Sequence, residues 1–235
     1  MRYLAPVTRT PVGAATGAAT AASDVDLPAG DAGDAALEGV RPLRDRTLAI
    51  VLVVLGAVAF LASGELAIER YLTLVDPMHA LSCTLNPLVD CGPAMNSWQG
   101  RLLGFPNPYI GLVAFPVVIT TGVLWLTGYR PPRWYRLSLL GGTVLGQALI
   151  FFLMFTILHE LRSICLYCAV VWTCMWPLLW LQVVHALQTR ALPAPDGLRR
   201  FAVGNRGLVL GLGYVVAVLW VALTMGRQLV ASFLG

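Results

Sequence analysis

The sequence predicts an all-α, polytopic membrane protein with five transmembrane helices. Of its 235 residues, 57% are hydrophobic and only 12% are charged, which is too apolar for an ordinary soluble domain. The apolar residues gather in stretches long enough to cross a bilayer. All 16 basic residues are arginines, and they flank these stretches and do not form a soluble patch interleaved with aromatic residues. We therefore read them as signals of membrane topology and expect no nucleic-acid partner.

The N-terminal part of the chain is predicted to contain a tail, one span and a long loop. Residues 1–46 are rich in Ala, Thr, Gly, Pro and Asp without apolar periodicity, so we expect a disordered cytoplasmic tail. The first span is expected over residues 47–64. Residues 65–107 carry seven charged or histidine side chains and four prolines. This segment is too polar to face lipid and is predicted to be an outer, extramembrane loop.

Four more spans are expected in the remainder of the chain. The second covers residues 108–127 and the third 137–158, with a short basic turn between them. A tight connection leads into the fourth span, residues 164–187. A basic cytoplasmic linker, residues 190–206, contains two prolines. Residues 207–235 are predicted to be the fifth transmembrane helix and a short outer tail.

The distribution of arginines predicts the orientation in the membrane. If the N-terminus is cytoplasmic, 12 arginines lie on the cytoplasmic side and 4 on the outer side. Cytoplasmic segments carry the excess of basic residues, so we expect this orientation. It places two close pairs of cysteines on the outer side, where disulfides form and persist.

One of these pairs lies at the mouth of the fourth span. Cys165 and Cys168 begin an apolar run in which Ser163 to Thr189 contains no Asp, Glu or Arg. Three residues apart on a helix, the two thiols share a face and can form a disulfide with little backbone movement. The helix N-terminus and Arg162 both favour a thiolate at Cys165. These features predict a redox-active pair, with a static disulfide as the alternative.

The other cysteines are interpreted from their surroundings. Cys83 and Cys91 lie in the proline-rich loop 65–107 and are read as a mobile shuttle pair, with a simple staple of the loop as the alternative. Cys174 lies six residues after Cys168, about 240° away around a helix, and is expected to be a buried small hydrophobe.

Two dithiols on one side of a membrane predict an electron relay. An external thiol protein would exchange with the loop pair, and the loop pair would exchange with the helix pair. The helix pair would then pass its electrons to an acceptor in the membrane. A lipid-soluble quinone suits this role because it is small and carries two electrons. Without such a sink the disulfides would not stay oxidised against a flow of substrate thiols.

Four motifs occur in order along the chain. They are Cys83-Thr-Leu-Asn-Pro-Leu-Val-Asp-Cys91, Asn96-Ser97-Trp98, Phe105-Pro-Asn-Pro-Tyr-Ile-Gly111 and Cys165-Leu-Tyr-Cys168. This set resembles the bacterial branch of the vitamin K epoxide reductase family over about residues 48–187. The resemblance implies that residues 47–189 form a four-helix catalytic bundle around a quinone of the menaquinone, ubiquinone or vitamin K type. The outer loop would cap this bundle, and the fifth helix would be the extra one of bacterial members.

The resemblance also implies roles for the cysteines. Cys165 and Cys168 would be the active-site pair, with Cys168 closest to the quinone. Cys83 would meet the partner protein, and Cys91 would attack Cys165. Ser97 matches a Ser or Thr that the family has near its active site. A cap of a short outer helix is the alternative role for this hydroxyl.

The resemblance further implies residues that contact the quinone. Asn107 aligns with an asparagine that hydrogen-bonds a quinone carbonyl, and an ordinary N-cap of the second span is the alternative. Trp172 replaces a pocket tyrosine of the vertebrate enzymes, and its indole can still stack on a quinone. Met95 is a further candidate pocket residue, and packing is the alternative for both Met95 and Trp172. His79 is interpreted as a solvated residue, with assistance in proton release as the alternative.

The implied function is that of a quinone-dependent thiol oxidoreductase in the bacterial plasma membrane. It would reoxidise a thioredoxin-fold, DsbA-like partner and so drive disulfide formation. Many bacterial relatives carry a fused thioredoxin-like domain. This chain ends at Gly235, so a separate partner protein is expected. Reduction of vitamin K quinone or epoxide is the first alternative. A cysteine-based metal-binding or transport protein is the second, and the absence of Asp and Glu from the predicted spans disfavours it.

Overall fold

The computed structural model describes residues 37, 39–85 and 88–234, with side chains as far as Gly226. Most of the predicted N-terminal tail, residues 1–46, lies outside this part of the chain. Five of the helices are long and apolar enough to cross a membrane, which confirms the all-α class. The long helices are α2 (Asp45–Val75), α4 (Pro108–Leu126), α5 (Arg133–Thr156), α6 (Leu166–Gln188) and α8 (Arg206–Leu234). The short ones are α3 (Gly92–Asn96), η1 (Gln99–Arg101), η2 (Ile157–Leu161) and α7 (Asp196–Gly204).

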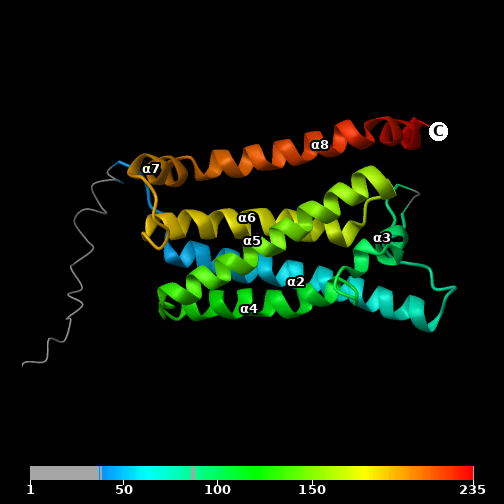
Figure 1. Cartoon of the computed structure of the whole chain (residues 1–235), viewed down its shortest axis with the longest axis horizontal. Coiled ribbons are helices and arrows are strands. Elements are labelled where there is room, and N and C mark those ends of the chain that lie inside the picture. The colour runs from blue at the N-terminus through cyan, green and yellow to red at the C-terminus, as the bar shows by residue number, and fades with distance from the viewer. Residues whose placement is uncertain (1–36, 38, 86–87, 235) are drawn as a thin grey trace, which may run out of the picture.

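Four of the long helices form a bundle, and α8 lies outside it beside α6 (Figure 1). Helix α2 packs against both α4 and α6, and α5 packs against α6. Buried leucines such as Leu48, Leu52 and Leu178 fill the space between these helices. Helices α2 and α4 pack closely at Gly122, where an added Cβ would lie 2.8 Å from the carbonyl oxygen of Ala49. The bundle is thus held by close helix contacts along α2.

Helical structure extends into three segments that were predicted to be non-helical. Helix α2 continues through residues 65–75, which were predicted to be loop, and ends at Val75 before Asp76 and Pro77. Glutamate, leucine, alanine and arginine are good helix formers, so charge marks the exit from lipid but does not end the helix. The predicted linker 190–206 contains helix α7, which begins after Pro195. The predicted outer tail belongs to α8, which continues to Leu234.

The predicted tight connection between the third and fourth spans has a specific geometry. Helix α5 runs into the π-helical turn η2, and Arg162 then adopts a left-handed conformation with φ of 52°. The backbone N–H of Arg162 donates to the carbonyl oxygen of Ile157 at 2.7 Å. The reversal leaves Cys165 in an extended conformation as the N-cap of α6. Cys165 therefore lies at the N-terminal end of α6.

Most of the described arginines lie at the end of the bundle opposite the cysteine pairs. At the end near α7, Arg206 donates to the carbonyl oxygen of Arg41 at 2.6 Å, and Arg133 donates to that of Ala191 at 2.8 Å. Helix α3 and the cysteine-bearing loop lie at the other end (Figure 1). The two ends differ in charge as the sequence predicted. Which end faces the cytoplasm stays a prediction.

Candidate functional site

The two loop cysteines are joined and buried. Cys83 and Cys91 form a disulfide, and neither residue has any exposed surface. The turn between them is closed by a hydrogen bond from the Leu85 N–H to the Val89 carbonyl oxygen at 3.0 Å. The Asp90 carboxylate adds a second tie, accepting from the Thr84 hydroxyl at 2.7 Å and from the Gly92 N–H at 2.9 Å.

The helix pair consists of two free thiols at the start of α6. The sulfur of Cys165 accepts a hydrogen bond from the backbone N–H of Cys168 at 3.3 Å, as an N-cap residue does. Hydrogen bonds from the Cys168 side chain and from the backbone N–H groups of Cys168 and Tyr167 lower the pKa of Cys165, although burial and the charge of Asp90 act in the opposite direction. A lowered pKa agrees with the thiolate expected there. Its causes are these hydrogen bonds, and Arg162 is not among them.

The structure brings both pairs into one buried cluster. Cys83, Cys91 and Cys165 are fully buried and form a cluster with the buried side chains of Leu66 and Met95. Tyr167 and Cys168 are partly buried and pack against this cluster. Two backbone hydrogen bonds hold the loop in place: the Asp90 N–H donates to the Ile164 carbonyl oxygen at 3.1 Å, and the Ile164 N–H donates to the Leu88 carbonyl oxygen at 2.7 Å. The loop pair is therefore docked on the segment that precedes Cys165.

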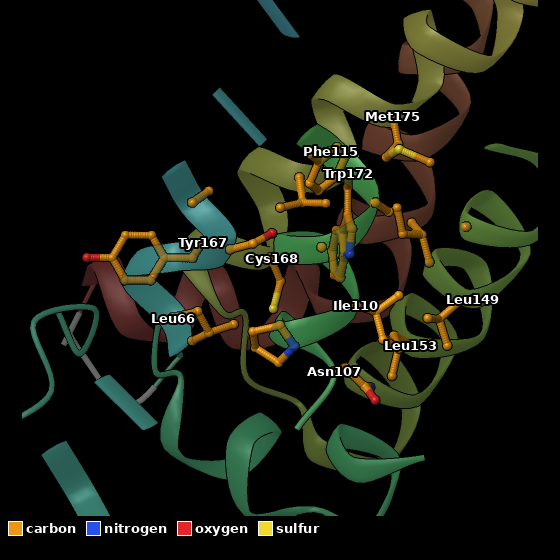
Figure 2. A pocket seen from close by; sticks show the side chains of 18 of the residues that line it. Leu66, Asn107, Ile110, Phe115, Leu149, Leu153, Tyr167, Cys168, Trp172 and Met175 are labelled. Atoms are coloured by element: carbon orange, nitrogen blue, oxygen red, sulfur yellow. The ribbon is translucent and has the colours of Figure 1, made fainter. Parts of the chain in front are cut away.

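A cavity of about 520 Å³ lies inside the bundle next to this cluster. Helices α2, α4, α5 and α6 all contribute to its wall, which is mostly apolar. In Figure 2 the Cys168 sulfur and the Trp172 ring point into it from α6, and Ile110 from α4 and Leu149 and Leu153 from α5 face them. The volume and the apolar wall fit a quinone ring with the first part of an isoprenoid tail.

The predicted site residues divide between the cavity and the cluster. Cys168, Trp172, Met95, Ser97 and Asn107 all line the cavity. The other three cysteines of the two pairs belong to the buried cluster behind it. Cys168 is common to both, since it lines the cavity and packs against the cluster. It is the sulfur through which electrons can pass from the cluster to a molecule in the cavity.

Ser97 and Asn107 organise the loop at the mouth of the cavity. The Ser97 hydroxyl donates to the Ala94 carbonyl oxygen at 2.9 Å and accepts from the Gly100 N–H at 3.0 Å, so Ser97, the C-cap residue of α3, joins α3 to η1. The Asn107 side chain does not cap α4. Its Nδ2 donates to the Gln99 carbonyl oxygen at 2.8 Å. Because an amide nitrogen carries two hydrogens, the second can serve a quinone carbonyl.

Sequence reasoning missed a polar group next to the cysteine cluster. Glu69 was interpreted as part of an interfacial face, but its side chain is buried and contacts His79 and the backbone of Ser82. Ser82 in turn contacts the hydroxyl of Tyr167. The spacing along α2 could have predicted this burial, because Glu69 lies three residues after the buried Leu66 and so shares its helix face.

Two further expectations concern residues outside this group. Cys174 is 4% exposed and packs in the main core of the bundle, as predicted for a small hydrophobe. Within the part of the chain that the structure describes, no group of three or more His, Cys, Asp or Glu residues is arranged to hold a metal ion.

Comparison with known proteins adds a family assignment. The model of the vitamin K epoxide reductase family matches residues 50–183, which is more than half of the chain. The matched interval contains both cysteine pairs and every residue of the candidate quinone site. Neither the curated proteins nor the solved structures gave a match.

Proposed function

The chain belongs to the vitamin K epoxide reductase family, whose members are quinone-dependent disulfide oxidoreductases, and from this premise we propose that it reoxidises a thioredoxin-fold, DsbA-like thiol protein. The observation that carries the proposal is the buried cluster of both cysteine pairs, with Cys168 on the wall of an apolar cavity. Such an arrangement links thiol chemistry at the loop to an acceptor inside the bundle.

Electrons pass through the cysteines in a fixed order in this proposal. The dithiol of the partner reduces the Cys83–Cys91 disulfide through a mixed disulfide with Cys83. The Cys91 thiolate then attacks the sulfur of Cys165, the Cys165–Cys168 bond breaks, and Cys168 leaves as a thiolate. Attack by Cys83 on Cys91 restores the loop disulfide and releases Cys165. Two electrons and two protons have then moved from the loop pair to the helix pair.

The cysteine states in the structure correspond to the end of this exchange. The loop pair is a disulfide and the helix pair is a dithiol. A quinone held in the cavity would be the final oxidant, and the helix pair would return to a disulfide as it gives up two electrons and two protons. The lowered pKa of Cys165 favours its release from the mixed disulfide with Cys91, since a thiol of lower pKa leaves faster.

The remaining residues of the site position these reactants. Asn107 would donate its second amide hydrogen to a quinone carbonyl and Trp172 would stack on the ring, whereas Met95 packs between the cluster and the cavity. Ser97 holds α3 and η1 together beneath the loop. We assign the end with the cysteine pairs to the extracytoplasmic side of a bacterial plasma membrane, and the arginine-rich end to the cytoplasm.

The test is anaerobic reduction of quinone by the purified protein. A reduced thioredoxin-fold, DsbA-like protein is the donor, and a short-tailed ubiquinone and menadione are tried as acceptors. We expect quinone reduction that requires all four paired cysteines and persists in Cys174→Ala. In Cys168→Ala a Cys91–Cys165 link should accumulate. Quinone reduction that survives loss of Cys83 or Cys91 would contradict the relay, and so would a Cys168→Ala variant without the mixed disulfide.

A further inference from the structure

A buried glutamine that the electron relay does not use lies between Asn107 and the turn that precedes the cysteine pair of α6. Gln99 is 4% exposed and lines the cavity, and its Nε2 donates to Glu160 Oε2 at 2.7 Å. We propose that Gln99 and Glu160 are positioning residues that hold the Asn107 amide toward a quinone carbonyl. The proposal rests on the proposed function, because it concerns the acceptor side of the same site.

The short helix η1 and its C-cap residue hold the Asn107 side chain at both ends of its amide. The Nδ2 of Asn107 donates to the Gln99 carbonyl oxygen at 2.8 Å, and its Oδ1 accepts from the Leu102 N–H at 3.3 Å. The Asn107 backbone N–H donates to the Gly100 carbonyl oxygen at 2.9 Å. These contacts use one of the two hydrogens on Nδ2 and leave the other for a ligand. The direction of that remaining N–H therefore depends on the position of η1.

Helix η1 has one buried side chain that can anchor it. Among residues 96–105, all of which the structure describes, Gln99 is the only buried one, and residues 101–105 are exposed. A single turn of 3₁₀ helix has few internal hydrogen bonds, so its position depends on contacts with neighbouring elements. The Ser97 hydroxyl, which accepts from the Gly100 N–H, joins η1 to α3, and the Gln99 side chain joins it to η2.

Glu160 connects this turn to the cysteine pair. It lies in the π-helical turn η2, five residues before Cys165, and the chain reverses between them at Arg162. The turn η2 also contributes to the cavity wall. Figure 2 shows Asn107 and Cys168 on the wall of the same cavity. One short segment therefore leads into the sulfur pair and also holds the element that orients Asn107, which fixes the two sides of the site relative to each other.

The contact between Gln99 and Glu160 is well suited to this task. A carboxylate acceptor makes the hydrogen bond charge-assisted, and such bonds are stronger than those between neutral groups. No described histidine or arginine forms an ion pair with Glu160, so its carboxylate is engaged with Gln99. Loss of the carboxylate would leave a buried amide without its acceptor, which favours a rearrangement of η1.

A purely structural role for the pair makes a different prediction. A pair that only stabilises the fold affects every ligand of the cavity alike, whether or not the Asn107 amide is present. A positioning pair affects only ligands that carry a carbonyl, and its effect disappears when the Asn107 amide is removed. A double-mutant cycle distinguishes the two cases, because residues that act through one another have non-additive effects.

The experiment measures binding to the fully oxidised protein, which has no electrons to give to the ligand. Menadione is titrated into the full-length protein in detergent, and quenching of tryptophan fluorescence reports its Kd. Methylnaphthalene has the same fused rings and methyl group without the carbonyls, and its Kd is obtained from displacement of menadione. The variants are Gln99→Leu, Glu160→Ala, Asn107→Leu and the combination Gln99→Leu/Asn107→Leu.

We expect Gln99→Leu and Glu160→Ala to raise the Kd of menadione about fivefold, the effect of losing one hydrogen bond, and to leave the Kd of methylnaphthalene unchanged. Gln99→Leu should have no further effect in the Asn107→Leu background. The matched control is Gln147→Leu, because Gln147 is also buried but is not part of the cavity wall. It should bind both ligands as the wild type does.

An exchange of the two groups tests the contact itself. Gln99→Glu places two carboxylates together and should weaken menadione binding at least as much as Gln99→Leu. Adding Glu160→Gln restores a hydrogen bond between an amide and a carboxylate in the reverse direction. The exchanged pair Gln99→Glu/Glu160→Gln should therefore recover most of the affinity for menadione.

Equal losses of affinity for menadione and methylnaphthalene would overturn the positioning role in favour of the structural one. Additive effects of Gln99→Leu and Asn107→Leu would do the same, and so would wild-type affinity in both Gln99→Leu and Glu160→Ala. If Gln99→Leu fails to fold, an exchanged pair that folds without recovering affinity overturns the proposal. A wild-type protein that neither binds menadione nor reduces it with the thiol donor would instead contradict the proposed function itself.

Discussion

The backbone N–H of Asp90 donates to the carbonyl oxygen of Ile164 at 3.1 Å, which ties the residue before Cys91 to the residue before Cys165. The Ile164 N–H returns a hydrogen bond to the loop at the Leu88 carbonyl oxygen. This closed arrangement suits exchange between the two pairs. It also buries the Cys83–Cys91 disulfide completely, so a protein partner requires a second arrangement in which the loop is released.

The first prediction concerns this backbone tie. Ile164→Pro removes the N–H that donates to Leu88 and keeps an apolar side chain. Losing one such hydrogen bond costs about 1 kcal/mol, a factor of about five in the population of the docked loop. In a Cys168→Ala background, we expect about fivefold less Cys91–Cys165 mixed disulfide on non-reducing electrophoresis. Ile164→Val retains the N–H and should give the full amount. An equal yield from the proline variant would show that docking does not depend on this tie.

The second prediction concerns release of the loop. Asp90→Ala removes the carboxylate that accepts from Thr84 and Gly92 but keeps the backbone N–H to Ile164. Because the turn is then less restrained, the buried disulfide should be exposed more often. We expect a water-soluble phosphine to reduce Cys83–Cys91 several-fold faster, since each lost hydrogen bond contributes about 1 kcal/mol. Asp76→Ala, which loses a hydrogen bond at an exposed turn, is the control and should leave this rate unchanged.

The third prediction concerns the ionisation of Cys165. The Cys168 side chain is the largest of the groups that lower its pKa, because its hydrogen bond stabilises the thiolate over the thiol. Cys168→Ala removes that hydrogen bond, so the pKa of Cys165 should rise and less thiolate should be present at a given pH. In a Cys174→Ala background with the loop disulfide intact, ultraviolet absorbance of the thiolate should titrate at higher pH. A midpoint that stays in place or falls would show that the backbone N–H groups alone set the pKa.

The sequence predicted the helical class and the location of the site better than it predicted the contacts within the site. Apolar length identifies a span because lipid leaves the backbone few alternatives, and the spacing of Cys165 and Cys168 is a local property. The end of α2 was misplaced because charged residues such as Glu69 are compatible with both a helix and a loop. Ser82 contacts both Glu69 and Tyr167, which are 98 positions apart in the chain, and no local sequence pattern predicts these contacts.

The fourth prediction tests the cavity with two adjacent glycines of α5. Gly142 lines the cavity, whereas its neighbour Gly141 does not, and a Cβ at either position meets no atom within 4 Å. Gly142→Phe should therefore fill part of the cavity without disturbing the bundle. We expect the KM for a short-tailed quinone to rise at least several-fold while exchange between the cysteine pairs stays at the wild-type rate. Gly141→Phe should leave both unchanged. Equal effects of the two variants would place the quinone elsewhere.

The last prediction concerns the packing that shapes the cavity. At Gly122 of α4, a Cβ would lie 2.8 Å from the Ala49 carbonyl oxygen and 2.8 Å from Cγ2 of Val53, both on α2. Gly122→Ala must push the two helices apart, and overpacking of this kind costs about 1–3 kcal/mol. Gly141→Ala adds the same methyl group to an unobstructed position and should be neutral or slightly stabilising, because alanine favours a helix over glycine. Thermal unfolding in detergent should show a lower Tm for Gly122→Ala only. A Tm equal to that of Gly141→Ala would mean that α2 and α4 can separate freely, in which case α4 could not hold Asn107 and Ile110 at fixed positions on the cavity wall.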